Sequence, residues 1–98
     1  MTLTAIDIDR LLDEADSGNT AAQAKIEAII IDLEGAQRRS LAAAADGERV
    51  AADENESQLI RAQAAMAAYY AHGHAREYGE EAAVLRLGEN PWGYEICY

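Results

Sequence analysis

The stretch "AQAAMAAYYAHG", residues 62–73, carries the pattern on which the fold depends. Its alanines are small enough to let a second helix approach closely, and Tyr69 and Tyr70 follow them. Neighbouring residues on a helix point about 100° apart, so we expect one ring to turn inward and the other to lie at the edge. The stretch therefore predicts a packing seam in which the tyrosine rings are the main fillers.

The apolar spacing extends this seam into a helix over about residues 57–72, which Gly73 ends as a C-cap. The predicted stripe of this helix contains Leu59, Ala62, Met66 and either Tyr69 or Tyr70. A further helix is expected over about residues 76–87, with Gly88 at its end and Pro91 just beyond.

Helix signals are also clear in the first half of the chain. Thr4 is a plausible N-cap, with Asp7 in the first turn and Leu3 and Ile8 at the positions of a hydrophobic staple. The first helix should end at Ser17 and Gly18. "TAAQ", residues 20–23, reads as a capping box that starts a second helix, and "DG" at 46–47 as its stop.

Two segments lack a regular helical pattern. Residues 48–57, "ERVAADENES", predict a polar connection or an exposed helical turn. The tail over 90–98 begins with Asn-Pro-Trp-Gly, which suits a β-turn, and then alternates so that Tyr94, Ile96 and Tyr98 share one face of an extended arm. We expect one all-α domain over 1–98: a small helical bundle or helix-hairpin pair of three to five helices, with an irregular aromatic tail.

Composition predicts a thin core and a binding role. Of 98 residues 22 are alanine, only 18 are Leu, Ile or Val, and the net charge is -10. Such a chain should be marginally stable unless it binds a partner or self-associates. Its acidity argues against direct contact with nucleic acid or anionic membrane and favours proteins with basic surfaces. The single cysteine, Cys97, and the absence of a signal peptide or long apolar run predict a cytoplasmic protein.

Catalytic and metal chemistry is not expected. His72 and His74 are two residues apart and so do not share a helix face, and no zinc-like ligand spacing adjoins them. No phosphate-binding loop or nucleophile motif is present in the sequence. We therefore expect no enzyme activity, no cofactor and no metal, and we keep a helical metal- or ligand-binding protein that uses the histidines as a second alternative.

Candidate partner-binding residues fall into two acidic runs and a set of aromatics. The acidic candidates are Asp46, Glu48, Asp53, Glu54 and Glu56 in one run, and Asp13 and Glu14 on the first helix, where Asp7, Asp9 and Asp16 are also acidic. The aromatic candidates are Tyr70, Trp92 and Tyr94. Helical carboxylates recur about 5–6 Å apart, near the spacing of successive phosphates. The leading prediction is an inhibitor or adaptor that blocks a basic surface of a nucleic-acid-handling protein. In type it resembles the DNA-mimicking and anti-CRISPR proteins of phages and mobile elements.

A 40-residue period gives an alternative. Ala22-Gln23 and Ala62-Gln63 are 40 residues apart, and "ADSGNTAAQAKI" (15–26) and "AQAAMAAYYAHG" carry the front and back halves of one pattern. That pattern resembles the Sel1-like repeats, relatives of the tetratricopeptide repeats. The resemblance implies a short α-solenoid that binds protein segments as a scaffold, or that self-associates.

Overall fold

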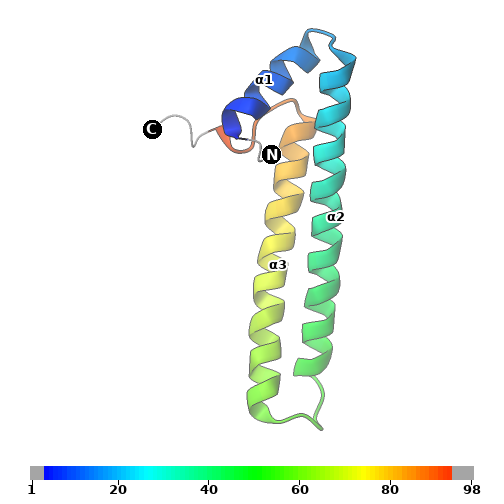
Figure 1. Cartoon of the computed structure of the whole chain (residues 1–98). Helices are drawn as coiled ribbons and strands as arrows, with labels where there is room; N and C mark the ends of the chain where they lie inside the picture. Colours follow the sequence, from blue (N-terminus) through cyan, green and yellow to red (C-terminus); the bar gives the residue numbers. More distant parts are fainter. Residues whose placement is uncertain (1–3, 94–98) are drawn as a thin grey trace. The chain divides into compact units, whose positions relative to one another are not determined.

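A computed structural model describes residues 4–93 of the chain. Within this range the chain folds into three α-helices (Figure 1). α1 spans Ala5–Asp16, α2 spans Thr20–Ala51 and α3 spans Gln58–Arg86. Within residues 4–93 there is no β-strand, so the predicted all-α class is confirmed. The predicted roles of Leu3, Tyr94, Ile96, Cys97 and Tyr98 fall outside the described residues.

The three helices contribute to two compact units. Unit 1 comprises residues 1–33 and 80–98, and therefore holds α1, the start of α2 and the end of α3. Unit 2 comprises residues 34–79 and holds the rest of α2 and α3. Each unit has its own packing, and each is described in turn below.

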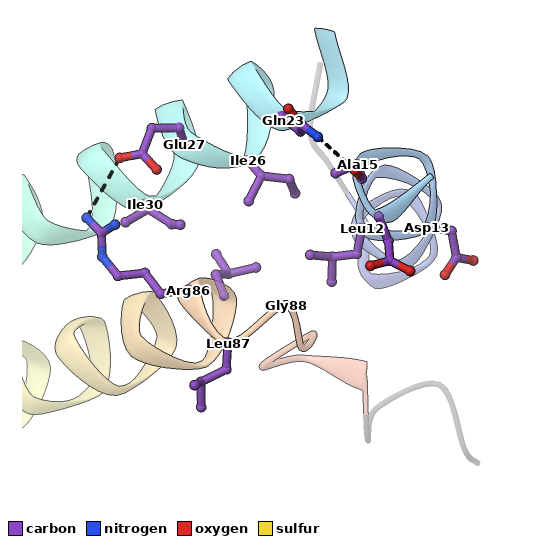
Figure 2. A pocket seen from close by; sticks show the side chains of 12 residues that line it. Leu12, Asp13, Ala15, Gln23, Ile26, Glu27, Ile30, Arg86, Leu87 and Gly88 are labelled. Carbon is purple, nitrogen blue, oxygen red and sulfur yellow. Dashed lines mark hydrogen bonds and ion pairs between the residues drawn. The ribbon is translucent and has the colours of Figure 1, made fainter. Parts of the chain in front are cut away.

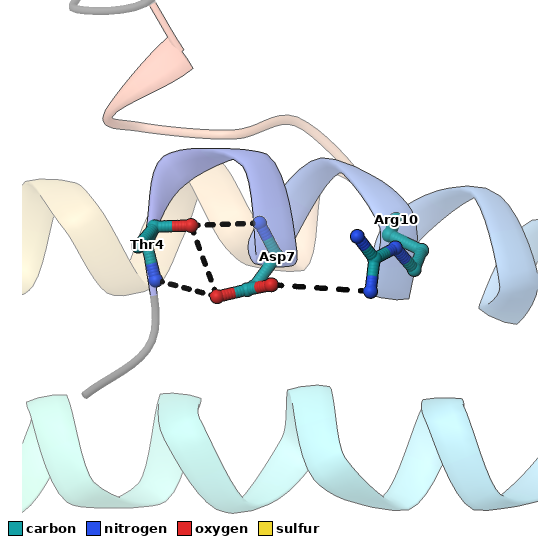
Figure 3. A network of polar contacts seen from close by, with 3 residues as sticks. All are labelled: Thr4, Asp7 and Arg10. Carbon is teal, nitrogen blue, oxygen red and sulfur yellow. Dashed lines mark hydrogen bonds and ion pairs between the residues drawn. The ribbon is translucent and has the colours of Figure 1, made fainter. Parts of the chain in front are cut away.

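The ends of α1 and α3 follow the sequence signals. The Thr4 hydroxyl accepts from the Asp7 amide at 3.2 Å, and the Asp7 carboxylate accepts from the Thr4 amide at 3.0 Å, which completes a capping box (Figure 3). These Thr4 hydrogen bonds lower the pKa of the Asp7 carboxyl. Gly18 and Gly88 have φ of 97° and 81°, the left-handed conformation that ends a helix in a Schellman motif.

The start of α2 differs from the prediction by one residue. Asn19 caps the helix, because its Oδ1 accepts from the Ala22 amide at 3.2 Å, whereas Thr20 is already helical. Gln23 does not close a capping box. Its Nε2 donates to the Ala15 carbonyl oxygen at 2.9 Å and so links α2 to α1.

Two predicted helix ends are wrong, at Gly47 and at Gly73. α2 continues through Gly47 to Ala51, and α3 runs without a break through Gly73. The connection is therefore only residues 52–57, and the third and fourth predicted helices are one. A glycine inside a helix costs about 1 kcal/mol relative to alanine, which packing along a long helix can offset.

Unit 1 has an ordinary core of large aliphatic side chains. Ile8 of α1, Ile26 and Ile30 of α2, and Ala82 and Leu85 of α3 are buried together. Around them lie the partly buried Leu11, Leu12, Ile29, Leu33 and Trp92. Ile8, Leu11 and Leu12 of α1 therefore face the core of unit 1.

Unit 2 is an antiparallel pair formed by the rest of α2 and α3 (Figure 1), and its seam consists of small residues. Ala44 of α2 and Ala68 and Ala75 of α3 are buried. A Cβ at Gly47 would lie 2.8 Å from the Ala64 carbonyl oxygen and 3.1 Å from the Ala68 Cβ, so the two backbones approach very closely there. This close contact explains why Gly47 lies inside α2 and does not end the helix.

The tyrosines are not the fillers of this seam, contrary to the prediction. The side chains expected to face it lie on the surface, with exposed fractions of 68% for Leu59, 57% for Met66, 73% for Tyr69 and 59% for Tyr70. Ala62 is exposed as well. The inward face of α3 is instead the row that contains Ala64, Ala68, Ala71 and Ala75, which also recurs every three or four residues. α3 therefore carries two rows with helical spacing, and the row of smaller residues is the one that packs against α2.

The start of the tail docks on unit 1. The Gly93 amide donates to the Asn90 carbonyl oxygen at 3.2 Å, which confirms the Asn-Pro-Trp-Gly turn. The Asn90 side chain donates to the Ala5 carbonyl oxygen at 2.8 Å and to the Asp9 carboxylate at 2.9 Å. These bonds hold the turn against α1 and let Trp92 pack on the core of unit 1.

Candidate functional site: an acidic hollow in unit 1

Unit 1 contains an open hollow of about 740 Å³ between α1, α2 and the end of α3 (Figure 2). Apolar side chains line part of it: Leu12 from α1, Ile26 and Ile30 from α2, and Leu85 from α3. Carboxylates contributed by Asp13, Asp16 and Glu27 also line it, together with the Arg86 guanidinium. The hollow thus combines an apolar surface with an excess of negative charge.

Local sequence explains how each carboxylate reaches the hollow. Asp13 and Asp16 are three residues apart and so lie on neighbouring positions of one helix face, and Leu12 beside them packs on the core. The Gln23 bond to the Ala15 carbonyl ties the start of α2 to α1 beside the hollow (Figure 2). Glu27 is one turn beyond Gln23 and is therefore brought to the same opening.

The hollow holds one basic side chain, and that side chain is already engaged. Arg86 lies 3.7 Å from the Glu27 carboxylate, with both side chains about half exposed. Among the described residues, no ion pair or side-chain hydrogen bond is recorded for Asp13 or Asp16. Two carboxylates therefore remain available to a cationic group from outside.

Charge is distributed unequally between the units. The residues of unit 1 include 11 Asp and Glu against three Lys and Arg, for a net charge of -8. The residues of unit 2 include seven against five, for a net charge of -2. The hollow therefore belongs to the unit that carries most of the acidity.

The acidic residues singled out from sequence are divided between the two units. Asp13 and Glu14 belong to unit 1, where Asp13 lines the hollow and Glu14 does not. Asp46, Glu48, Asp53, Glu54 and Glu56 all belong to unit 2. Sequence reasoning noted Asp16 but missed Glu27, because Glu27 comes from another helix and only the turn at Gly18 brings the two together.

Several of the unit 2 acids already have partners. The Asp46 carboxylate pairs with Arg49 at 2.8 Å, and Glu48 contacts His72 across the helix pair. Asp53 accepts from the Asn55 amide at 2.9 Å within the connection. Glu54 and Glu56 are exposed, and no partner of either carboxylate is recorded within residues 4–93.

The aromatic candidates differ in their surroundings. Tyr70 is exposed and packs edge-to-face on Tyr69, with ring centroids 5.6 Å apart. Trp92 is partly buried against the core of unit 1. Tyr94 lies outside the described residues.

Residues 4–93 contain neither a cluster of metal ligands nor a membrane-spanning helix. No group of three or more His, Cys, Asp or Glu side chains there could hold a metal ion. None of the three helices has a stretch sufficiently long and apolar to cross a membrane.

Comparison with known protein families, characterised proteins and solved structures gave no match. The solenoid that the Sel1-like resemblance implies would need a helix pair in each 40-residue unit. Instead, Ala22 and Ala62 each lie within a helix of about 30 residues, and Ala22 is buried whereas Ala62 is exposed. The two halves of the proposed repeat are therefore not equivalent in this fold.

Proposed function

We propose that the chain is a non-enzymatic binding protein, an inhibitor or adaptor, that docks unit 1 on a basic protein surface. The observation that carries this proposal is the hollow, in which Asp13 and Asp16 have no recorded partner and adjoin an apolar surface. Nucleic-acid-handling proteins are the partner class with the most suitable surfaces, because they expose arginine and lysine for phosphates.

The chemistry of the hollow suits an arginine or lysine side chain. Such side chains carry a long apolar stem and a cationic head. They bury the stem on apolar surface while the head remains in polar surroundings. The stem would lie on Leu12 and Ile26, while a guanidinium head would reach the Asp13 or Asp16 carboxylate, where two-pronged hydrogen bonding is favourable. The volume of about 740 Å³ is within the usual range for binding pockets.

The remaining acidity of unit 1 contributes at longer range. A net charge of -8 on these residues attracts a basic partner before contact and raises the association rate. The contribution is screened over about 8 Å at physiological ionic strength. Binding should therefore weaken steeply with salt, and most of the loss should be in the association rate.

Two synthetic peptides test the proposal: one that alternates arginine with leucine, and one that alternates arginine with serine and has the same charge. We expect the full chain to bind the arginine-leucine peptide more tightly, because only that peptide can use the apolar surface of the hollow. The affinities are measured by calorimetry at low and physiological salt.

Charge-reversed variants locate the site. Asp13→Lys with Asp16→Lys should reduce the affinity for the arginine-leucine peptide at least tenfold. Glu54→Lys with Glu56→Lys makes the same change of charge in unit 2 and should reduce it far less. Equal losses for the two variants, or equal affinity for the two peptides, would mean that binding reflects net charge alone and that the hollow is not the site.

A further inference from the structure

The outer face of α3 in unit 2 carries an apolar row for which the described residues provide no cover. Leu59, Ala62, Met66, Tyr69 and Gly73 follow one another at alternating spacings of three and four residues. That is the spacing of a helix–helix seam. The row that packs against α2, which contains Ala68 and Ala75, uses different positions of the same helix. α3 therefore has two seams, and only one of them is covered by residues 4–93.

We propose that this outer seam pairs with the same seam of a second copy of the chain, with the two α3 helices antiparallel and the two-fold axis close to Met66. A two-fold interface must be self-complementary, because each residue meets the counterpart equally far on the other side of the axis. The row around Met66 satisfies this condition in side-chain size, and the charges beyond its ends are compatible with it.

Large side chains fall opposite small ones in this arrangement. Leu59 is seven residues before Met66, and Gly73 is seven residues after it. Beside Gly73 the surface is hollowed by about 210 Å³, and Tyr69 and Tyr70 line this hollow. Leu59 of each copy enters the hollow of the other. Ala62 of the row falls opposite Tyr70, which borders the row and gives a second large–small pair, and Tyr69 falls opposite Gln63.

Charges near the ends of the seam are also compatible with this orientation. Arg76 is ten residues after Met66, so in an antiparallel pair it reaches past Gln58, where α3 of the other copy begins, to the acidic connection that carries Glu54 and Glu56. No partner of these three side chains is recorded among residues 4–93. A parallel pairing would instead place the Arg76 side chains of the two copies at the same level, which is unfavourable.

The acidic hollow of unit 1 contributes no residue to this interface, so self-association and the proposed function can fail separately. Sedimentation equilibrium of the full chain, from about 1 µM to about 1 mM, tests the pairing over the affinity range of weak and transient interfaces. We expect a monomer–dimer equilibrium that Met66→Glu or Tyr69→Glu weakens at least tenfold. Ile31→Glu, at another exposed apolar residue, is the matched control and should leave the equilibrium unchanged. Circular dichroism verifies that each variant is helical.

Thiol cross-linking tests the orientation in a Cys97→Ser background. Met66→Cys lies near the two-fold axis and should be joined to its counterpart by a short bifunctional maleimide. Leu59→Cys should not be joined, because the two thiols are about 20 Å apart along the antiparallel helices. A chain that stays monomeric at every concentration, a dimer insensitive to Met66→Glu and Tyr69→Glu, or equal cross-linking at positions 59 and 66 would each overturn the proposal.

Discussion

Units 1 and 2 share the two long helices but use their apolar residues in different ways. In unit 1 the large side chains Ile8, Ile30 and Leu85 are buried together. In unit 2 the buried side chains are those of alanines, and Leu59, Met66 and Tyr69 are on the surface. The way a helix packs can thus change along its length. In one part its large apolar side chains form a core. In another part its small residues allow a second helix to approach closely, and its largest side chains remain exposed for a partner.

Removing a large buried side chain from unit 1 should have the largest effect on stability. Leu85 is 2% exposed, so Leu85→Ala should lower the free energy of unfolding by about 2–5 kcal/mol. Met66→Ala in unit 2 should change it by less than about 0.5 kcal/mol in the monomer. Urea unfolding followed by circular dichroism, at low protein concentration, measures both.

Ile30→Val provides a milder change in the same core and leaves more folded protein to measure than Leu85→Ala does. It removes one buried methylene group and should cost about 0.5–1.5 kcal/mol. If Met66→Ala proved as destabilising as Ile30→Val, the contrast between the two units would be lost.

Adding a methyl group to the close contact in unit 2 should have the next largest effect. Gly47→Ala would force the Ala64 and Ala68 backbone away and cost about 1–3 kcal/mol, which outweighs the gain of about 1 kcal/mol in helix propensity. Gly73 is the control, because a Cβ there would meet nothing within 4 Å. Gly73→Ala should therefore stabilise the monomer by up to about 1 kcal/mol.

Thermal unfolding of these two variants should thus move in opposite directions. If Gly47→Ala raised the midpoint as much as Gly73→Ala does, α2 and α3 would not be in close contact at Gly47. The seam of small residues would then have to be placed elsewhere on the helices.

The smallest expected effect is a pH dependence that belongs to unit 1. The Thr4 amide and hydroxyl, which donate to the Asp7 carboxylate, lower its pKa below the ordinary value of 3.8. The ionised form is therefore favoured by folding. Its contribution to stability is complete above that ordinary pKa and is lost as the pH falls through the lowered value.

Asp7→Asn should remove this part of the acid dependence. Asp16→Asn removes the same charge from α1 outside the capping box and should retain it. The unfolding midpoint is measured between about pH 2 and pH 6, which brackets the transition. An unchanged pH profile in Asp7→Asn would show that the capping box does not contribute to the stability of α1.

The sequence predicted those features of the fold that local chemistry determines. Thr4 with Asp7 identified the start of α1, Gly18 and Gly88 the ends of α1 and α3, and residues 90–93 the turn. Each of these signals depends on groups within about five residues. The acidic run on α1 likewise contained Asp13, which lines the hollow.

The features of the fold that the sequence did not predict depend on contacts between residues that are far apart in the chain. Gly47 and Gly73 resemble helix stops, and only the approach of Ala64 and Ala68 explains why the first is inside a helix. The rows through Met66 and through Ala68 have the same period, so spacing could not decide between them. The larger side chains of the Met66 row made it the expected seam, and this was wrong. The free energy gained when two helix backbones approach closely cannot be read from the sequence of one helix. Glu27 joined the hollow by the same kind of distant contact.

Hydroxyl-radical labelling with mass spectrometry tests most directly the contrast between the two units. Labelling of each side chain in the native monomer is compared with that in the urea-unfolded chain. We expect Leu59, Met66 and Tyr69 to react nearly as fast as in the unfolded chain, and Ile8, Ile30 and Leu85 to be strongly protected. Protection of Met66 and Tyr69 equal to that of Leu85, at a concentration where the chain is monomeric, would contradict this expectation.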